Sequence, residues 1–222
     1  SPCAYLLTGS TAAAGAELSL ARRSIFVRTS GVLTHLGRTE TIVFDCDALS
    51  RMHSIDTDFP RIVTTLRHMG LHPVLRMGDD AETAARIGAA AGISDLRSDA
   101  DMERASASSA PVALVHFHQC AAHGSSIRIA LSGSTSAADA VILGDDLHAL
   151  PVLVRMARRT RRKIEQNEIF GNTLGLIGVG LAAAGILTPV SGALWHAVSA
   201  LILLLNATSL RSVGEREKKF AF

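Results

Sequence analysis

Aspartates follow two predicted strands at the points where these strands end. The apolar, β-rich run Thr41–Phe44 ends in Asp45, and the next apolar run, His72–Leu75, leads into Met77-Gly78-Asp79. In a sheet built by strand–helix alternation, the carboxyl ends of parallel strands meet at one edge, where ligands bind. We therefore expect Asp45 and Asp79 to face one site, although Asp at a strand end is also a common turn or capping residue.

A second set of chemically capable side chains follows a later strand: His116, Phe117, His118, Cys120 and His123. A strand would place His116 and His118 on one face with Cys120 nearby, an arrangement that could bind Zn²⁺ or Cu⁺. The alternative is a solvent-facing strand end whose polar residues bind nothing.

Strands and helices alternate through residues 41–154, which predicts an α/β domain with a parallel sheet. Apolar residues have helical spacing over Phe59–Met69, which stops at Gly70, and an Ala-rich helix over Ala81–Ala91 is closed by Gly92. Further strands are predicted at Val112–Phe117, Ile127–Leu131 and Val141–Leu143, and a turn at Asp145–Leu150.

The composition excludes several classes of protein. The 222 residues are 48% hydrophobic and 19% charged, which argues against disorder. The three widely spaced cysteines exclude a disulfide framework and a closed Cys-rich zinc site. With one Trp and one Tyr, the chain has few aromatic side chains that could stack on the bases of a single-stranded nucleic acid, so we expect no nucleic-acid partner.

Residues 169–210 contain no Asp, Glu, Lys or Arg. A helix needs about 20 apolar residues to cross a bilayer, so this run predicts a two-helix hairpin, Ile169–Leu187 and Val190–Leu210, turning at Thr188-Pro189. Basic segments at 155–168 and 211–222 flank it, which predicts a multi-pass protein, in contact with membrane lipid, with both hairpin ends in the cytoplasm. A buried helical hairpin of a soluble protein is the alternative.

Residues 1–16 are uncharged but too short and too polar to cross a membrane alone. This segment is typical of the end of a membrane helix, followed by a connecting stalk over residues 17–40. We therefore expect the chain to be a fragment, a processed product or one part of a larger assembly.

The order of these pieces resembles the C-terminal half of a heavy-metal (type IB) P-type ATPase. Ser1-Pro2-Cys3 is similar to the family's intramembrane metal-binding triplet, Thr41–Asp45 to the run into its phosphorylation site, and Met77-Gly78-Asp79 to its Thr-Gly-Asp motif. Further similar segments are Ile129–Gly133, Ala138–Leu143, Asp145–Leu147, Arg162–Asn167 and Leu205–Ala207. The resemblance implies a haloacid-dehalogenase-like phosphorylation domain plus transmembrane α-helices, with Asp45 as the phosphorylation site and Mg²⁺ as cofactor.

The chain departs from this family in the motifs that carry out phosphoryl transfer. The family's Asp-Lys-Thr-Gly-Thr is Asp45-Cys46-Asp47-Ala48-Leu49, and His116–Cys120 replaces its Mg²⁺-binding carboxylate loop. For its phosphate-binding Lys, the stretch offers only Arg97 and Arg104. Where the family has its nucleotide-binding domain, this chain has only the short link Ser50–Asp58, which leads directly into the next predicted helix. Because a carboxylate attacks a phosphoryl group only where Mg²⁺ and fixed cations neutralise the oxygens, Asp45 is predicted to be vestigial.

The resemblance also implies a transition-metal site (Co²⁺, Zn²⁺ or Cu⁺) formed by Cys3, His196 and Ser199. His196-Ala197-Val198 stands where the Ser-Pro-Cys subgroup has His-Glu-Gly, so one member of the site is lost. An ionisable side chain inside a membrane suggests function, whereas Trp195 beside it offers an interfacial anchor with a neutral His as the alternative.

Three functions follow from this comparison. The first is an ATPase-inactive relative of a heavy-metal pump, linked to transition-metal transport or homeostasis. The second is an active transport subunit completed by a companion chain that carries the nucleotide domain. The third is a membrane-tethered phosphatase in which Asp45 and Asp47 form a carboxylate pair and Asp79 or Asp80 helps to hold Mg²⁺.

Overall fold

The computed structural model describes residues 2–50, 55–78, 80–101, 112–116, 127–131, 138–144 and 146–208. The chain divides into two compact units. The sheet unit comprises Leu20–Arg158, and the helical unit comprises Ser1–Ser19 together with Arg159–Phe222.

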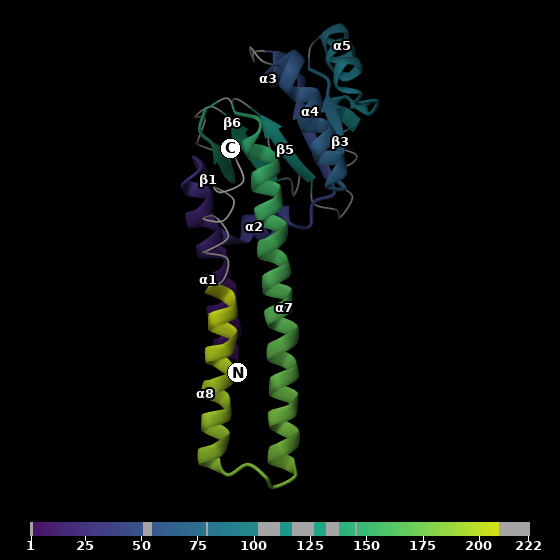
Figure 1. Ribbon diagram of the computed structural model, residues 1–222. Coiled ribbons are helices and arrows are strands. Elements are labelled where there is room, and N and C mark those ends of the chain that lie inside the picture. Colours follow the sequence, from purple (N-terminus) through teal and green to yellow (C-terminus); the bar gives the residue numbers. More distant parts are fainter. Residues whose placement is uncertain are drawn as a thin grey trace. The chain divides into compact units, whose positions relative to one another are not determined.

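In the described residues, the sheet unit has seven strands in the order β1-β7-β6-β5-β2-β3-β4 (Figure 1). The bounds are β1 Ile25–Val27, β2 Thr41–Asp45, β3 His72–Arg76, β4 Leu96–Arg97, β5 Val112–His116, β6 Ile127–Leu131 and β7 Ala140–Ile142. All pairs are parallel except the edge pair of β1 with β7, which is antiparallel. The predicted α/β domain with a parallel sheet is confirmed.

The core of the sheet unit lies against the interior strand β2, which pairs with β5 and β3. Its Ile42, Val43 and Phe44 are fully buried, as expected for a strand with other strands on both sides. Helix α4 (Ile55–His68) begins four residues before the predicted start at Phe59, and it buries Phe59, Ile62, Val63 and Leu66 at helical spacing. The rings of Phe44 and Phe59 meet edge to face, with centroids 5.0 Å apart.

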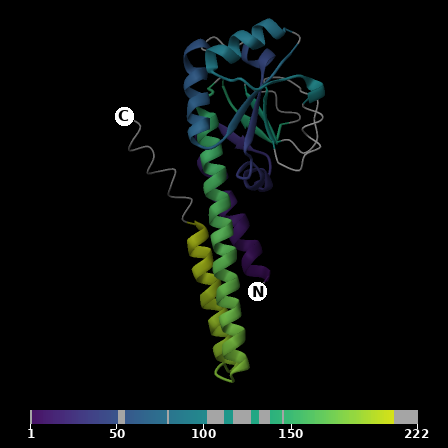
Figure 2. The ribbon, with the colours of Figure 1, turned by 90° about the vertical axis from the view of Figure 1, so that its right-hand side faces the viewer.

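Helix α5 (Ala81–Ala91) has the predicted bounds, and its end signals explain why. Asp80 caps its start by accepting hydrogen bonds from the backbone N–H of Glu82 and Thr83, and Gly92 ends it with a φ of 69°, a conformation that favours glycine. Helices α4 and α5 pack on each other and on β3 (Figure 2). Helix α3 (Cys46–Ser50) follows β2 directly.

The segment expected to be a connecting stalk carries structure that the sequence did not indicate. Helix α1 spans Pro2–Ala21, past the predicted end at residue 16, and β1 and helix α2 (Ser30–Leu36) follow it. A strand of three residues is too short for a periodicity signal, and β1 forms because β7 offers it a free edge.

The helical unit contains α7 (Ala149–Ala183), of which the first residues belong to the sheet unit, and α8 (Pro189–Thr208). The two helices run side by side in opposite directions (Figure 1). Gly185 ends α7 with a φ of 71°, and Thr188 caps α8 by accepting a hydrogen bond from the Ser191 N–H at 3.3 Å. The connection between the two helices therefore covers residues 184–188, so that of the predicted turn Thr188-Pro189 only Thr188 lies in it, and Pro189 is the first residue of α8.

Among the described residues, one helix segment is long and apolar enough to cross a membrane, Pro189–Ala207, with a mean hydropathy of 1.6. The uncharged part of α7 is rich in Gly and ends at Ala183 rather than at the predicted Leu187. A second crossing by this part of α7, and with it the two-span hairpin, stays a prediction.

Candidate functional site

The edge formed by the carboxyl ends of β2, β3 and β5 holds the predicted phosphorylation residue. Asp45 is the last residue of β2, and in the parallel pairing it lies directly opposite Arg76, the last residue of β3. On its other side, β5 ends at His116, one position beyond the paired Phe44 and Val115. The side chain of Asp45 is 16% exposed, so solvent reaches it only at the edge of the sheet.

Arg76 is the cation of this edge. Its Nη1 donates to Asp45 Oδ2 at 3.4 Å, while its Nε and Nη2 donate to the two carboxylate oxygens of Asp99 at 2.5 and 3.1 Å. The sequence analysis missed Arg76 and named Arg97 and Arg104 instead. The rule that identified Asp45, a charged residue directly after a buried apolar run, also identifies Arg76.

Arg97 is engaged elsewhere. Its Nε and Nη2 donate to Asp95 at 2.9 and 2.7 Å, and His72 Nε2 lies 3.0 Å from the same carboxylate. The hydrogen bonds from Arg97, with a smaller contribution from His72, hold the pKa of Asp95 below its ordinary value, even though burial opposes this. The Arg97 guanidinium is therefore engaged with Asp95, and Arg104 lies outside the described residues.

The remaining residues predicted for this site are described only in part. Asp47 lies in α3, but its side chain is outside the described residues, as is the whole of Asp79. Asp80 is occupied as the cap of α5, and hydrogen bonds from Thr83 lower the pKa of its carboxyl. Cys46 is buried, as expected for a small packing residue.

His116 is 2% exposed, which contradicts the solvent-facing strand end considered for it. The other members of its predicted cluster, Phe117, His118, Cys120 and His123, lie outside the described residues. The described residues contain no group of three or more His, Cys, Asp or Glu side chains placed to hold a metal ion. The Zn²⁺ or Cu⁺ site at this cluster therefore stays a prediction.

The described side chains of this edge do not fit Mg²⁺. That ion requires near-octahedral oxygen ligands, of which carboxylates are the usual protein members. Here the carboxylates of Asp45 and Asp99 both already contact the Arg76 guanidinium, and the neighbouring strand β5 ends in an imidazole rather than an acid.

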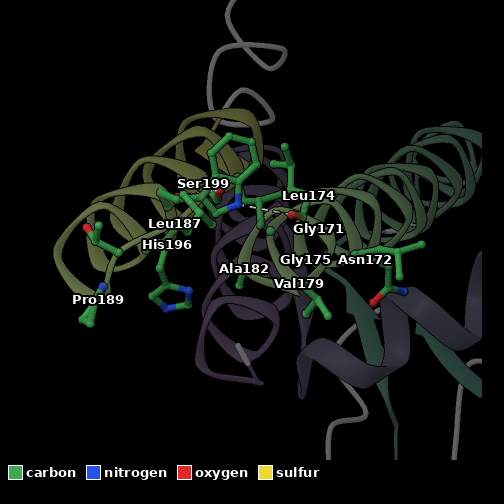
Figure 3. A pocket seen from close by; sticks show the side chains of 17 residues that line it. Gly171, Asn172, Leu174, Gly175, Val179, Ala182, Leu187, Pro189, His196 and Ser199 are labelled. Atoms are coloured by element: carbon green, nitrogen blue, oxygen red, sulfur yellow. Dashed lines mark hydrogen bonds between the residues drawn. The ribbon is translucent and has the colours of Figure 1, made fainter. Parts of the chain in front are cut away.

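A groove of about 980 Å³ runs along the helical unit between α7 and α8 (Figure 3). Small residues of α7 line it, among them Gly171, Gly175 and Gly178. The ring of Trp195 fills the space that Gly178 leaves: a Cβ on Gly178 would lie 2.8 Å from the Trp195 Nε1. The indole N–H donates to the Leu174 carbonyl at 3.3 Å, drawn as a dashed line in Figure 3.

Two of the predicted metal ligands line this groove. His196 and Ser199 both belong to α8, and the Ser199 hydroxyl donates to the Trp195 carbonyl at 2.7 Å (Figure 3). Cys3 lies in α1, but its side chain is outside the described residues. The structure thus places an imidazole and a hydroxyl on one groove, and the three-residue site stays a prediction.

Polar side chains join α7 and α8 nearer the other end of α8. Lys163 Nζ donates to Asn206 Oδ1 at 3.0 Å, and Asn206 Nδ2 donates to Asn167 Oδ1 at 2.5 Å. Asn167 is 1% exposed. Close by, Ala12 of α1 packs with Ala207 of α8 and Ile164 of α7. These contacts fix the pairing of the helices within the helical unit.

Comparisons with known proteins give relatives of one kind. No family model matches the chain. It is 28% identical over 197 residues to the cation-transporting P-type ATPase B of Mycobacterium tuberculosis, covering 80% of this chain and 26% of that protein. It is 27% identical over 168 residues to the copper-exporting P-type ATPase of Bacillus subtilis, covering 69% and 21%. A probable cadmium-transporting ATPase of Staphylococcus aureus is 27% identical over 176 residues, covering 70% and 24%.

Solved structures agree on the fold. A zinc-transporting PIB-type ATPase in the E2.Pi state superposes with a TM-score of 0.78 at 16% identity, covering 95% of this chain and 56% of that one. The E2P state gives a TM-score of 0.73 at 15% identity, with coverages of 94% and 55%.

The homologues of this chain are cation-transporting P-type ATPases, including heavy-metal ones. The predicted resemblance and the fold class that it implied are confirmed. The chain spans about a quarter of the length of the curated relatives it matches.

Proposed function

We propose that this chain is a membrane-bound, ATPase-inactive relative of the heavy-metal P-type ATPases, with a role in transition-metal transport or homeostasis. In this proposal α8 and the uncharged part of α7 cross the membrane as a hairpin with both ends in the cytoplasm. The transition-metal cation is the substrate or ligand, and lipid surrounds the hairpin.

The short connection after the phosphorylation residue carries this proposal. The resemblance places a nucleotide-binding domain after Asp45, but here β2 passes into α3 at Cys46, α4 begins at Ile55, and β3 begins at His72. A link of this length cannot hold a domain. Loss of the Lys and Thr residues next to Asp45, and the contact of Asp45 with Arg76, support the same conclusion.

Phosphate transfer from ATP tests the proposal. We expect the purified chain in detergent, with Mg²⁺ and labelled ATP, to form no acid-stable phosphoenzyme. The reason is the combined loss of the nucleotide domain expected after Asp45, of the Lys next to it, and of the family's Mg²⁺-binding carboxylates. Label that appears on the wild type and is lost in Asp45→Asn would contradict it. Mg²⁺-dependent hydrolysis of a simple phosphate ester that also needs Asp45 would instead select the phosphatase alternative.

Metal binding at the groove is tested with Co²⁺. A thiolate and an imidazole are suitable ligands for a transition metal, but two such ligands bind weakly unless Ser199 or water completes the shell. We expect the wild type in detergent to show weak, saturable thiolate-to-Co²⁺ absorption that Cys3→Ser/His196→Ala removes. His68→Ala, on the exposed end of α4, serves as the control and should leave the spectrum unchanged. Equal spectra for the wild type and the double variant would refute the site.

A further inference from the structure

Arg76 joins two carboxylates at the sheet edge where the resemblance places a divalent cation. It contacts Asp45 at 3.4 Å through one guanidinium nitrogen and Asp99 at 2.5 and 3.1 Å through the other two. The Arg76 and Asp45 side chains are 17% and 16% exposed, so water screens their contact less than it screens a surface ion pair.

The backbone holds all three groups in place. Asp45 and Arg76 are paired residues of neighbouring parallel strands, which sets their side chains next to each other at the edge. Beyond β3, the N–H of Met77 donates to the carbonyl of Arg97 at 2.8 Å, which fixes the end of β3 against β4. Asp99 lies at the start of a helical segment, where Ser98 and Asp101 exchange reciprocal hydrogen bonds, one of them at 2.6 Å between Ser98 Oγ and Asp101 Oδ2.

This arrangement supplies to Asp45 the positive charge that a metal ion would otherwise supply. A guanidinium binds a carboxylate through directed hydrogen bonds, and it keeps its charge at every physiological pH. A divalent cation that approached Asp45 would meet the positive charge of Arg76 on the adjacent strand, and displacing Arg76 would break its contacts with Asp99 as well.

We propose that Arg76 is an internal counter-ion that occupies the cation position beside Asp45, so that this sheet edge excludes Mg²⁺. This inference goes beyond the proposed function, which concerns phosphoryl transfer and the transported metal. In this proposal Arg76, Asp45 and Asp99 form an ion-pair network that needs no divalent ion. Arg76 holds the two carboxylates and is not a catalytic residue.

A Mn²⁺ titration of the full-length chain in detergent tests this inference, read from the spin-resonance signal of free Mn²⁺. Mn²⁺ prefers the same oxygen ligands as Mg²⁺. We expect wild type and Asp45→Asn to bind Mn²⁺ equally, because Asp45 is not available to the ion. In Arg76→Gln, the affinity should rise about tenfold or more, since the repelling charge is gone, and Arg76→Gln/Asp45→Asn should lose this gain.

Two further variants serve as matched controls. Arg61→Gln removes an exposed guanidinium from α4 and should titrate as the wild type does. Arg76→Lys keeps the charge and should also exclude Mn²⁺. Mn²⁺ binding by the wild type that Asp45→Asn removes would overturn the inference, even if Arg76→Gln did not fold. A folded Arg76→Gln with no gain would overturn it too. Neither result bears on phosphate labelling, which tests the proposed function separately.

Discussion

Phe44→Ala is expected to destabilise the sheet unit by about 3–5 kcal/mol, the range for removing a fully buried aromatic side chain. Phe44 is 0% exposed, lies next to Asp45 on the interior strand β2, and packs edge to face on Phe59. Hydrogen exchange of the full chain in detergent can measure this loss within β2 and β5. Because each 1.4 kcal/mol is a factor of ten, amide protection there should fall about a hundredfold to a few thousandfold.

Phe26→Ala provides the matched control. Phe26 belongs to the same unit, on the edge strand β1, but it is 48% exposed. Its removal should lower the free energy of unfolding by less than about 1 kcal/mol. Equal losses of protection for the two variants would show that Phe44 is not at the centre of the core.

Asn206→Ala is expected to lower the free energy of unfolding of the helical unit by roughly 1–3 kcal/mol, the cost of leaving a buried polar group without its partner. Asn206 accepts from Lys163 and donates to Asn167, and Asn167 is buried in the contact between α7 and α8. The chain's single tryptophan, Trp195, packs between the same two helices. Its fluorescence in a denaturant titration in detergent therefore reports the decrease in the free energy of unfolding.

Asn172→Ala serves as the control for Asn206→Ala. Asn172 lies on α7 but is exposed, so the same truncation should leave the unfolding midpoint almost unchanged. If Asn206→Ala also unfolded at the wild-type midpoint, the Lys163–Asn206–Asn167 chain would contribute nothing to the pairing of the helices.

The sequence predicted those elements whose signals are local. Strand β2 is a continuous apolar run, and α5 has Asp80 and Gly92 as its start and stop signals, so both were found with correct bounds. Strand β1 was missed because it owes its existence to pairing with β7, far away in the sequence. Likewise, the composition divides a basic segment at 155–168 from the apolar run after it, but it does not reveal that both belong to one continuous helix, α7.

At the candidate site, the sequence predicted Asp45 but not its partner. Asp45 was identifiable as a carboxylate at a strand end within a recognisable motif. Arg76 also follows a buried apolar run, but the resemblance places the phosphate-binding cation elsewhere, in the stretch that contains Arg97 and Arg104. Strand register, which a single sequence does not reveal, brings Arg76 next to Asp45.

Labelling with acetyl phosphate tests the central claim, the inactivity of Asp45, most directly, because this donor needs no nucleotide domain. The account predicts that the purified full-length chain in detergent, with Mg²⁺ and a transition metal present, takes up no acid-stable, hydroxylamine-sensitive phosphate above the level of Asp45→Asn. Phosphate on the wild type that is absent from Asp45→Asn would contradict it. That result would instead support a transport subunit that needs only a companion nucleotide domain.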